Sequence, residues 1–316
     1  MASTFSINHT ATAGFRLIGK RPVSFVVWTL VWLVLGMGPL ALTMVTLMPK
    51  MFEFMRGADG LGSDPSHALS RVLAFEATIW GTLGPWALWG FLVQLVLLSA
   101  TYRAMLEPQK RAFAYLRVGM DELRLLATEV LLVLLFVLLS IVLGIVIALF
   151  FWAGAAVSSP WTGWIGALGV ILALCVMFYV GIKVSLALPA TFAEKQIRVF
   201  EALRLGRGRF WSLVGMWLLS LVFIFALSIV TGIIARVAAF GVMMGAGGPQ
   251  AIANAFSNVK SGADMANALS HMLGLLGPAL IGWLLFHGIV QALVRVIATA
   301  PFASAYAAFT DRSDAI

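Results

Sequence analysis

Six long apolar runs constrain what this chain can fold into more than any other feature. A helix needs about 20 apolar residues to cross the hydrocarbon core of a bilayer, and each run is long enough. The runs are continuous and rich in Leu, Val and Ile, whereas the strands of a membrane β-barrel alternate over about ten residues. We therefore predict an all-α polytopic membrane protein with a single transmembrane domain over residues 1–316. Its six spans lie approximately at 22–49, 77–102, 125–152, 161–193, 210–238 and 272–300.

The composition excludes a soluble fold. Hydrophobic residues make up 61% of the chain and charged residues 11%, against about 45–50% and about 25% in soluble domains. The one cysteine, Cys175, lies inside an apolar run, which excludes a disulfide scaffold. The first run is too long for the apolar region of a cleaved signal peptide, so we expect it to remain as the first span.

The basic residues predict the orientation. Fourteen of the 21 lysines and arginines lie in the two tails and in the loops after spans two and four, and four lie in the opposite loops. The positive-inside rule therefore places both termini in the cytoplasm. The net charge of +8 favours anionic lipid headgroups as partners, at roughly 1 kcal/mol per nearby basic residue. Nucleic acid is not expected, because the basic residues flank spans and form no separate domain.

The two basic loops resemble each other. Residues 107–119 align without gaps to residues 194–206, with seven of thirteen positions identical. Each copy carries a Glu–Arg pair at i,i+4 and ends in a glycine where a helix C-cap is expected. We predict a short amphipathic elbow helix in each loop, lying on the inner membrane surface. Residues 13–19 form a partial third copy, so the chain is expected to contain two-helix repeats that all point the same way.

Arginines in these loops are candidate contacts for lipid phosphates. The segment from Arg204 to Arg209 is basic and glycine-rich, but it lacks the preceding strand and the Gly-Lys-Ser/Thr of a nucleotide-binding loop. The alternative is a solvated basic cluster that merely flanks the spans. The candidates are Arg111, Arg117, Arg198, Arg204, Arg207 and Arg209.

Ionisable residues at membrane depth are candidates for function. Lys183 is the deepest, Glu129 lies about one turn into span three, and Arg295 lies near the inner end of span six. Together they predict a polar pathway or a headgroup site. The alternative is snorkelling of the long side chains combined with one structural ion pair.

Two neutral polar residues share a face of span six. His287 and Gln291 are separated by four positions, and an interhelical hydrogen bond is the favoured interpretation. A metal site would need further ligands, and the other histidines lie in tails or outer loops. We predict no metal, no cofactor and no catalytic residues, because no nucleophile elbow, zinc motif or pair of intramembrane aspartates is present.

The segment Leu188–Gly215 resembles a known family of membrane proteins. It has a proline near the end of a span (Pro189), an acidic residue (Glu194), an Ala-Leu-Arg helix ending at Arg204, and a Gly-Arg-Phe-Trp entry into the next span ending at Trp211. This pattern is similar to the membrane domain fused to some bacterial glycerophosphodiester phosphodiesterases and to stand-alone YciC-like six-helix proteins. The resemblance implies a six-span fold in a bacterial inner membrane. The phosphodiesterase domain is missing, so its activity does not transfer.

From these features we expect a non-enzymatic inner-membrane protein that engages lipid or a partner protein and has a role in the cell envelope. The alternative is a transporter or channel for a small solute or lipid, favoured by Lys183 and by the glycines and prolines within the spans. An intramembrane enzyme is the third hypothesis. The sequence leaves open whether a protein partner or a second copy of the chain binds.

Overall fold

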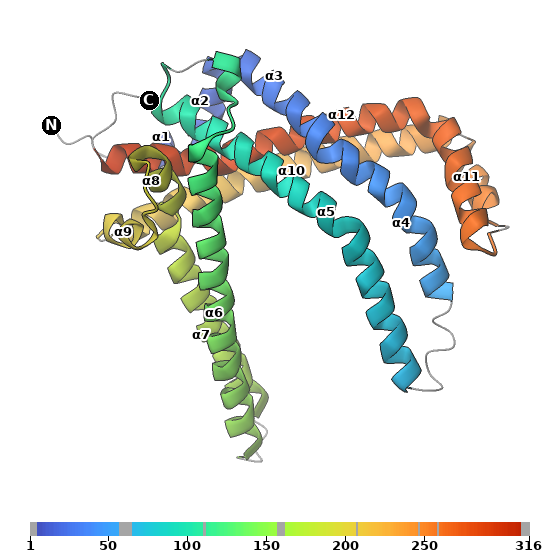
Figure 1. Ribbon diagram of the computed structural model, residues 1–316, viewed down its shortest axis with the longest axis horizontal. Coiled ribbons are helices and arrows are strands. Elements are labelled where there is room, and N and C mark those ends of the chain that lie inside the picture. Colours follow the sequence, from blue (N-terminus) through green and yellow to red (C-terminus); the bar gives the residue numbers. More distant parts are fainter. Residues whose placement is uncertain are drawn as a thin grey trace. The chain divides into compact units, whose positions relative to one another are not determined.

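The computed structural model describes residues 5–56, 65–109, 112–156, 162–206, 208–245, 247–257 and 259–310. Every regular element in these ranges is helical (Figure 1). Six of the helical segments are long and apolar enough to cross a membrane. The prediction of an all-α membrane protein with six spans is therefore confirmed. The segments are Pro22–Arg56, Leu69–Leu106, Ala112–Ala155, Gly163–Glu194, Phe210–Gly245 and Ala279–Phe309.

The helices are longer than the spans predicted from apolar runs. The 42 residues of α5 extend about 63 Å at about 1.5 Å per residue, twice the thickness of a hydrocarbon core of about 30 Å. The helices continue because flanking charged residues also favour helix.

The elements are α1 (Ile7–Ala11), α2 (Ala13–Lys20), α3 (Pro22–Val31), the π-helix η1 (Trp32–Met37), α4 (Gly38–Arg56), α5 (Pro65–Leu106), α6 (Met120–Ala156), α7 (Thr162–Val184), α8 (Ala187–Glu194), α9 (Val199–Leu205), α10 (Phe210–Gly245), α11 (Gly248–Phe256) and α12 (Gly262–Phe309).

The chain divides into two compact units, each assembled from separate stretches. Unit 1 comprises Met1–Lys20, Leu98–Val222 and Val296–Ile316, and unit 2 comprises Arg21–Leu97 and Phe223–Arg295. Helices α5, α10 and α12 each contribute residues to both units. The units are described separately below.

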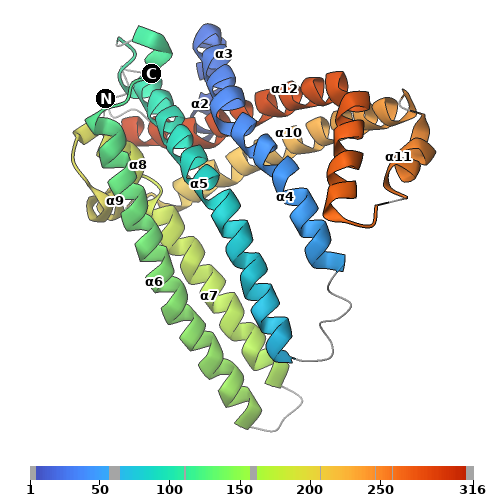
Figure 2. The same ribbon diagram turned by 45° about the vertical axis from the view of Figure 1, so that its right-hand side comes forward.

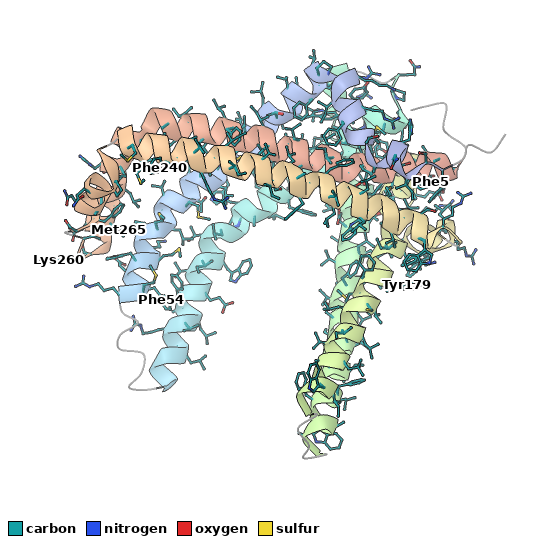
Figure 3. The ribbon with its side chains drawn as sticks, turned by 180° about the vertical axis from the view of Figure 1, so that it is seen from behind. Phe5, Phe54, Tyr179, Phe240, Lys260 and Met265 are labelled. Carbon is teal, nitrogen blue, oxygen red and sulfur yellow. The ribbon has the colours of Figure 1, made fainter. Side chains whose placement is uncertain are left out.

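In unit 1, α6 and α7 form a hairpin and lie side by side (Figure 2). Two glycines of α7 make their close packing possible. A Cβ on Gly166 would lie 2.4 Å from the ring of Phe151, and one on Gly169 would lie 2.9 Å from the side chain of Phe150. Many other side chains of the pair project outward (Figure 3), and most of these are exposed and apolar. This arrangement suits helices surrounded by hydrocarbon.

The two ends of the chain meet in unit 1. The backbone of α2 packs onto the last part of α12, where a Cβ on Gly14 would lie 2.7 Å from Cα of Ile297. The rings of Phe5 and Phe309 are 4.9 Å apart. The described residues nearest the two ends of the chain therefore lie at the same end of this unit, as the predicted topology requires; which side of a membrane they occupy stays a prediction.

The first predicted elbow differs from expectation. Instead of one helix over residues 107–119, the chain makes a turn in which Phe113, Ala114 and Tyr115 all have positive φ values. The guanidinium of Arg103 donates a hydrogen bond to the carbonyl of Tyr115 (3.0 Å), and the Tyr115 hydroxyl donates to the carbonyl of Pro108 (3.2 Å). These bonds occupy groups that a helix would use, so the expected helix is replaced by a turn.

Gly119 does not act as the predicted helix C-cap. Its N–H donates to the carboxylate of Glu122 (2.9 Å) in the first turn of α6, so it begins a helix rather than ending one. The second elbow agrees better with the prediction, because α9 is helical and ends at Gly206. The partial third copy, residues 13–19, lies within α2.

In unit 2, a π-helix interrupts the first span. Pro39 has no N–H and cannot donate to the carbonyl of Leu35, four residues earlier. The indole N–H of Trp89 on α5 donates to this carbonyl instead (2.8 Å). An unpaired carbonyl in hydrocarbon would be costly, so Trp89 stabilises the irregular helix just before Pro39.

We expect Gly14→Val to destabilise unit 1 by about 1–3 kcal/mol, because the new side chain would collide with the backbone of α12. Gly19→Ala on the same helix is the matched control, since nothing lies within 4 Å of its Cβ position; it should be neutral or stabilising. Thermal unfolding in detergent measures both. Equal stability of the two variants would contradict the close approach.

A double-mutant cycle tests the Trp89–Leu35 hydrogen bond. Trp89→Phe should cost about 1–3 kcal/mol, because the Leu35 carbonyl loses its donor. In a Pro39→Ala background the same change should cost clearly less, because the new N–H of residue 39 can reach that carbonyl. Equilibrium unfolding of the four proteins in detergent gives the coupling energy. A coupling energy of zero would show that the two residues act independently.

Candidate functional site

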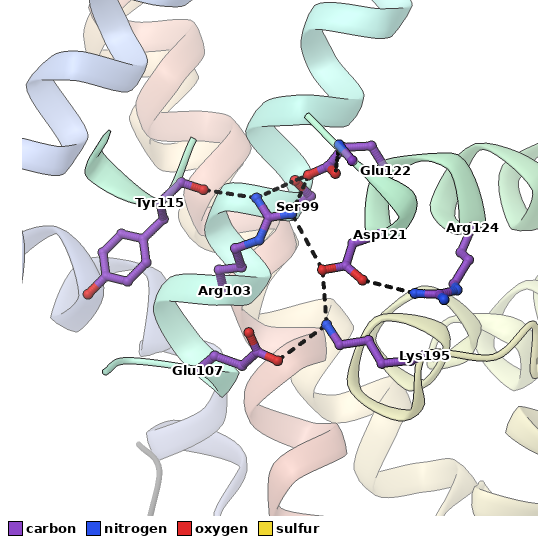
Figure 4. Close-up of polar contacts among 9 residues, drawn as sticks. Ser99, Arg103, Glu107, Tyr115, Asp121, Glu122, Arg124 and Lys195 are labelled. Atoms are coloured by element: carbon purple, nitrogen blue, oxygen red, sulfur yellow. Dashed lines mark hydrogen bonds and ion pairs between the residues drawn. The ribbon is translucent and has the colours of Figure 1, made fainter. Parts of the chain in front are cut away.

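The most heavily buried charges lie in unit 1, where α5 ends and α6 begins (Figure 4). Arg103 is 4% exposed and Glu122 is 5% exposed. Arg103 Nη2 lies 2.5 Å from Glu122 Oε1, and the Ser99 hydroxyl donates to the same oxygen. Charges this deeply buried require partners, because burial of a single ion costs several kcal/mol.

A chain of ion pairs continues from this pair toward α8. Asp121 Oδ2 lies 3.6 Å from Arg103 Nη2 and 3.1 Å from Lys195 Nζ. Lys195 also contacts Glu107 Oε1 (3.2 Å), and Arg124 contacts Asp121 Oδ1 (3.1 Å). The cluster, which we call the Arg103 network, therefore joins the ends of α5 and α8 to the start of α6.

The Arg103 network is balanced in charge. Its three cations, Arg103, Arg124 and Lys195, face the three anions Glu107, Asp121 and Glu122. Two of the cations also lie over the ring of Phe192, with Lys195 Nζ 4.2 Å and Arg103 Cζ 5.7 Å from its centroid. Because each charge has an opposite partner, the network is suited to holding helix ends together rather than to exchanging protons with a substrate.

Sequence reasoning missed this network, because it counted Arg103, Arg124 and Lys195 only as charges flanking the spans. A signal was present: three of the chain's 13 acidic residues, Glu107, Asp121 and Glu122, lie close together beside Arg103. Because acidic residues are rare in this chain, three of them near one arginine indicate that they form ion pairs with buried cations.

A second polar contact joins α8, the following turn and α12. The hydroxyl of Tyr306 donates to Glu194 Oε1 (3.0 Å), and Arg198 Nε lies 2.9 Å from Glu194 Oε2. The predicted i,i+4 pair of Glu194 and Arg198 is thus confirmed. Arg198 also pairs with Glu201, so this headgroup candidate is already engaged by two carboxylates.

The other headgroup candidates differ in their surroundings. Arg117 and Arg204 are exposed, and neither forms an ion pair or hydrogen bond within the described part of the chain. Arg209 lies over the ring of Phe309, 4.5 Å from its centroid. Arg111 and Arg207 lie outside the described residues.

The polar candidates within the spans of unit 1 are separate from each other. Lys183 lies in the last turn of α7, with Nζ 5.6 Å from the ring centroid of Tyr179. Its Cδ lies 4.0 Å from the Cβ position of Gly206, so the side chain reaches the second elbow. Glu129 is half-buried on α6 and interacts electrostatically with the buried Tyr102. No ion pair joins Lys183 to Glu129.

The remaining candidates lie on α12 in unit 2. His287 and Gln291 are hydrogen-bonded to each other (3.3 Å) within one helix, rather than across helices as predicted. The ring of Trp283 stacks on His287, with centroids 5.1 Å apart. Arg295 Cζ lies 3.2 Å from the ring centroid of Trp32 in η1. The four α12 residues recur every four positions and so share one face of the helix.

The chain was compared with models of protein families, with curated proteins and with solved structures, and none of the three comparisons gave a match. The resemblance to the YciC-like and phosphodiesterase-associated membrane domains therefore stays a prediction.

We expect Arg103→Met to lower the free energy of unfolding by about 3–5 kcal/mol, because it leaves Glu122 buried without its cation. Adding Glu122→Gln should recover part of this loss, since the unpaired charge is then removed. Denaturation in detergent micelles measures both variants. If the double variant is no more stable than the single one, the cost does not come from the uncompensated carboxylate.

Proposed function

We propose that this chain is a non-enzymatic inner-membrane protein that engages anionic lipid headgroups on the cytoplasmic side and serves the cell envelope. The supporting observation is a set of exposed residues in unit 1, which we call the basic rim. It comprises Phe113, Arg117, Val118, Phe200 and Arg204. The rim belongs to the two loops that the positive-inside rule assigns to the cytoplasm.

The chemistry of the basic rim fits a membrane surface. Phe113 is 85% exposed and Phe200 is 69% exposed, which is unfavourable in water but suited to the boundary between headgroups and acyl chains. Arg117 and Arg204 have no ion-pair partner among the described residues. Their guanidinium groups are therefore available to lipid phosphates, to which arginine binds through two parallel hydrogen bonds.

An apolar cavity in unit 2 also supports lipid engagement rather than passage of a polar solute. It has a volume of about 700 Å³ and lies between α10 and α12, which run side by side there. Its walls include Val242, Met243, Leu280, Trp283 and Phe286. Transport through Lys183 gains less support, because this side chain lies at the end of α7 against the second elbow.

We expect Arg117→Gln combined with Arg204→Gln to reduce the retention of phosphatidylglycerol relative to phosphatidylcholine roughly 30-fold at low salt. That factor corresponds to about 1 kcal/mol for each cation, and it should shrink as salt rises. Native mass spectrometry of protein extracted from mixed-lipid nanodiscs measures the ratio. Lys50→Gln with Arg56→Gln, two exposed cations of α4, is the control. A ratio that falls equally in the control would refute the basic rim as the headgroup site.

A further inference from the structure

Glu129 is a carboxylate inside a membrane-spanning segment, where a charged group needs a partner. It lies nine residues after Met120, the first residue of α6, and so about 14 Å along the helix. It is inside the segment Ala112–Ala155 that can cross a membrane. A carboxylate at this depth is costly unless a cation or a polar cavity compensates it.

The described chain supplies no cation to Glu129. Arg103, Arg124 and Lys195 are all bound to the other carboxylates of the Arg103 network. Lys183 lies over the ring of Tyr179 instead. No ion pair or hydrogen bond of Glu129 is formed with any residue in the described ranges. The described part of the chain therefore leaves Glu129 open to a cation from another molecule.

An apolar groove begins at Glu129 and follows one face of α6. Its volume is about 580 Å³. The lining positions recur at the spacing of a helix face, from residue 129 to residue 141, which is about 18 Å along the axis. Beyond Glu129 the groove is apolar except for one hydroxyl. The lining residues are Leu132, Val133, Phe136, Val137, Ser140 and Ile141.

We propose that this groove binds an amine-bearing phospholipid of the ethanolamine type, with its ammonium group on Glu129 and an acyl chain along α6. The charge is complementary, because an ammonium offers three N–H donors to a carboxylate, whereas a lipid with only a phosphate would be repelled. The direction also fits. Glu129 is near the start of α6, which follows the predicted cytoplasmic loop, and Ile141 is deeper in the span. The ammonium group would therefore lie toward the cytoplasm and the acyl chain toward the membrane centre, as in a lipid of the inner leaflet.

This inference rests on the proposed lipid-engaging function but uses a different site in unit 1 and a lipid group of opposite charge to the phosphates bound by the basic rim. The basic rim and the Glu129 groove can therefore be tested by separate measurements. Retention of phosphatidylglycerol reports on Arg117 and Arg204, and retention of phosphatidylethanolamine reports on Glu129. One proposal can be refuted while the other is supported.

The test uses the full chain in nanodiscs containing phosphatidylethanolamine, phosphatidylcholine and phosphatidylglycerol. Native mass spectrometry after extraction should show one phosphatidylethanolamine retained by the wild-type protein. Glu129→Gln should reduce this retention about tenfold or more, the effect expected from loss of one charge-assisted hydrogen bond. Glu76→Gln, which removes an exposed carboxylate of α5, should leave it unchanged.

A second variant tests the acyl part of the groove. Val137→Trp fills the groove but keeps Glu129, and it should also reduce phosphatidylethanolamine retention while circular dichroism shows an unchanged helix content. Wild-type retention in both variants would overturn the proposal. So would a preference of the Glu129 site for phosphatidylglycerol, or Glu129-dependent binding of tetraphenylphosphonium without any retained phosphatidylethanolamine, which would indicate a site for hydrophobic organic cations.

Discussion

Hydrogen bonding of the backbone inside hydrocarbon is the constraint on which this structure depends. With no water available, each N–H and C=O group needs a partner within the chain, and a continuous helix is the simplest solution. Where the described helices are interrupted, side chains take over the role of backbone donors. Trp89 donates to Leu35 at the π-helix, and in the turn after α7 the Ser185 hydroxyl (2.8 Å) joins its own backbone N–H (3.4 Å) in donating to the carbonyl of Ile182.

The spans could be predicted because the thickness of the bilayer fixes the length of an apolar run, whatever the rest of the chain does. The ends of the helices could not. Arg103 and Glu122 look like loop residues in a sequence, since isolated charges belong in water. In the structure they are buried because they neutralise each other. That pairing joins two helices, and the sequence indicates it only through the concentration of acidic residues near Arg103.

The two similar loops show how far local sequence determines local structure. Seven of thirteen positions are identical, yet only the second loop forms the expected helix, α9. In the first loop the carbonyl of Tyr115 is bound by Arg103 from outside the aligned segment. A donor outside the aligned segment therefore accompanies the difference between the two loops. Of the candidate site residues, those in the spans lie on helices as predicted, whereas Arg117 and Arg198, expected in elbow helices, lie in non-helical segments. The partners of Arg198, His287 and Arg295 required the tertiary structure.

The charges of unit 1 divide into two groups with different roles. Those of the Arg103 network pair with one another and hold helix ends together, while Arg117, Arg204 and Glu129 form no ion pair within the described chain. The proposed lipid contacts rest on these unpaired charges.

The exchange of one hydrogen-bond donor for another at Leu35 has a consequence for how such a chain can evolve. With proline at position 39, the Leu35 carbonyl needs a donor such as the Trp89 indole. With any other residue at position 39, a backbone N–H is present and the indole donor is no longer needed. Positions 39 and 89 should therefore change together among related chains, as a covarying pair whose intermediate states are selected against.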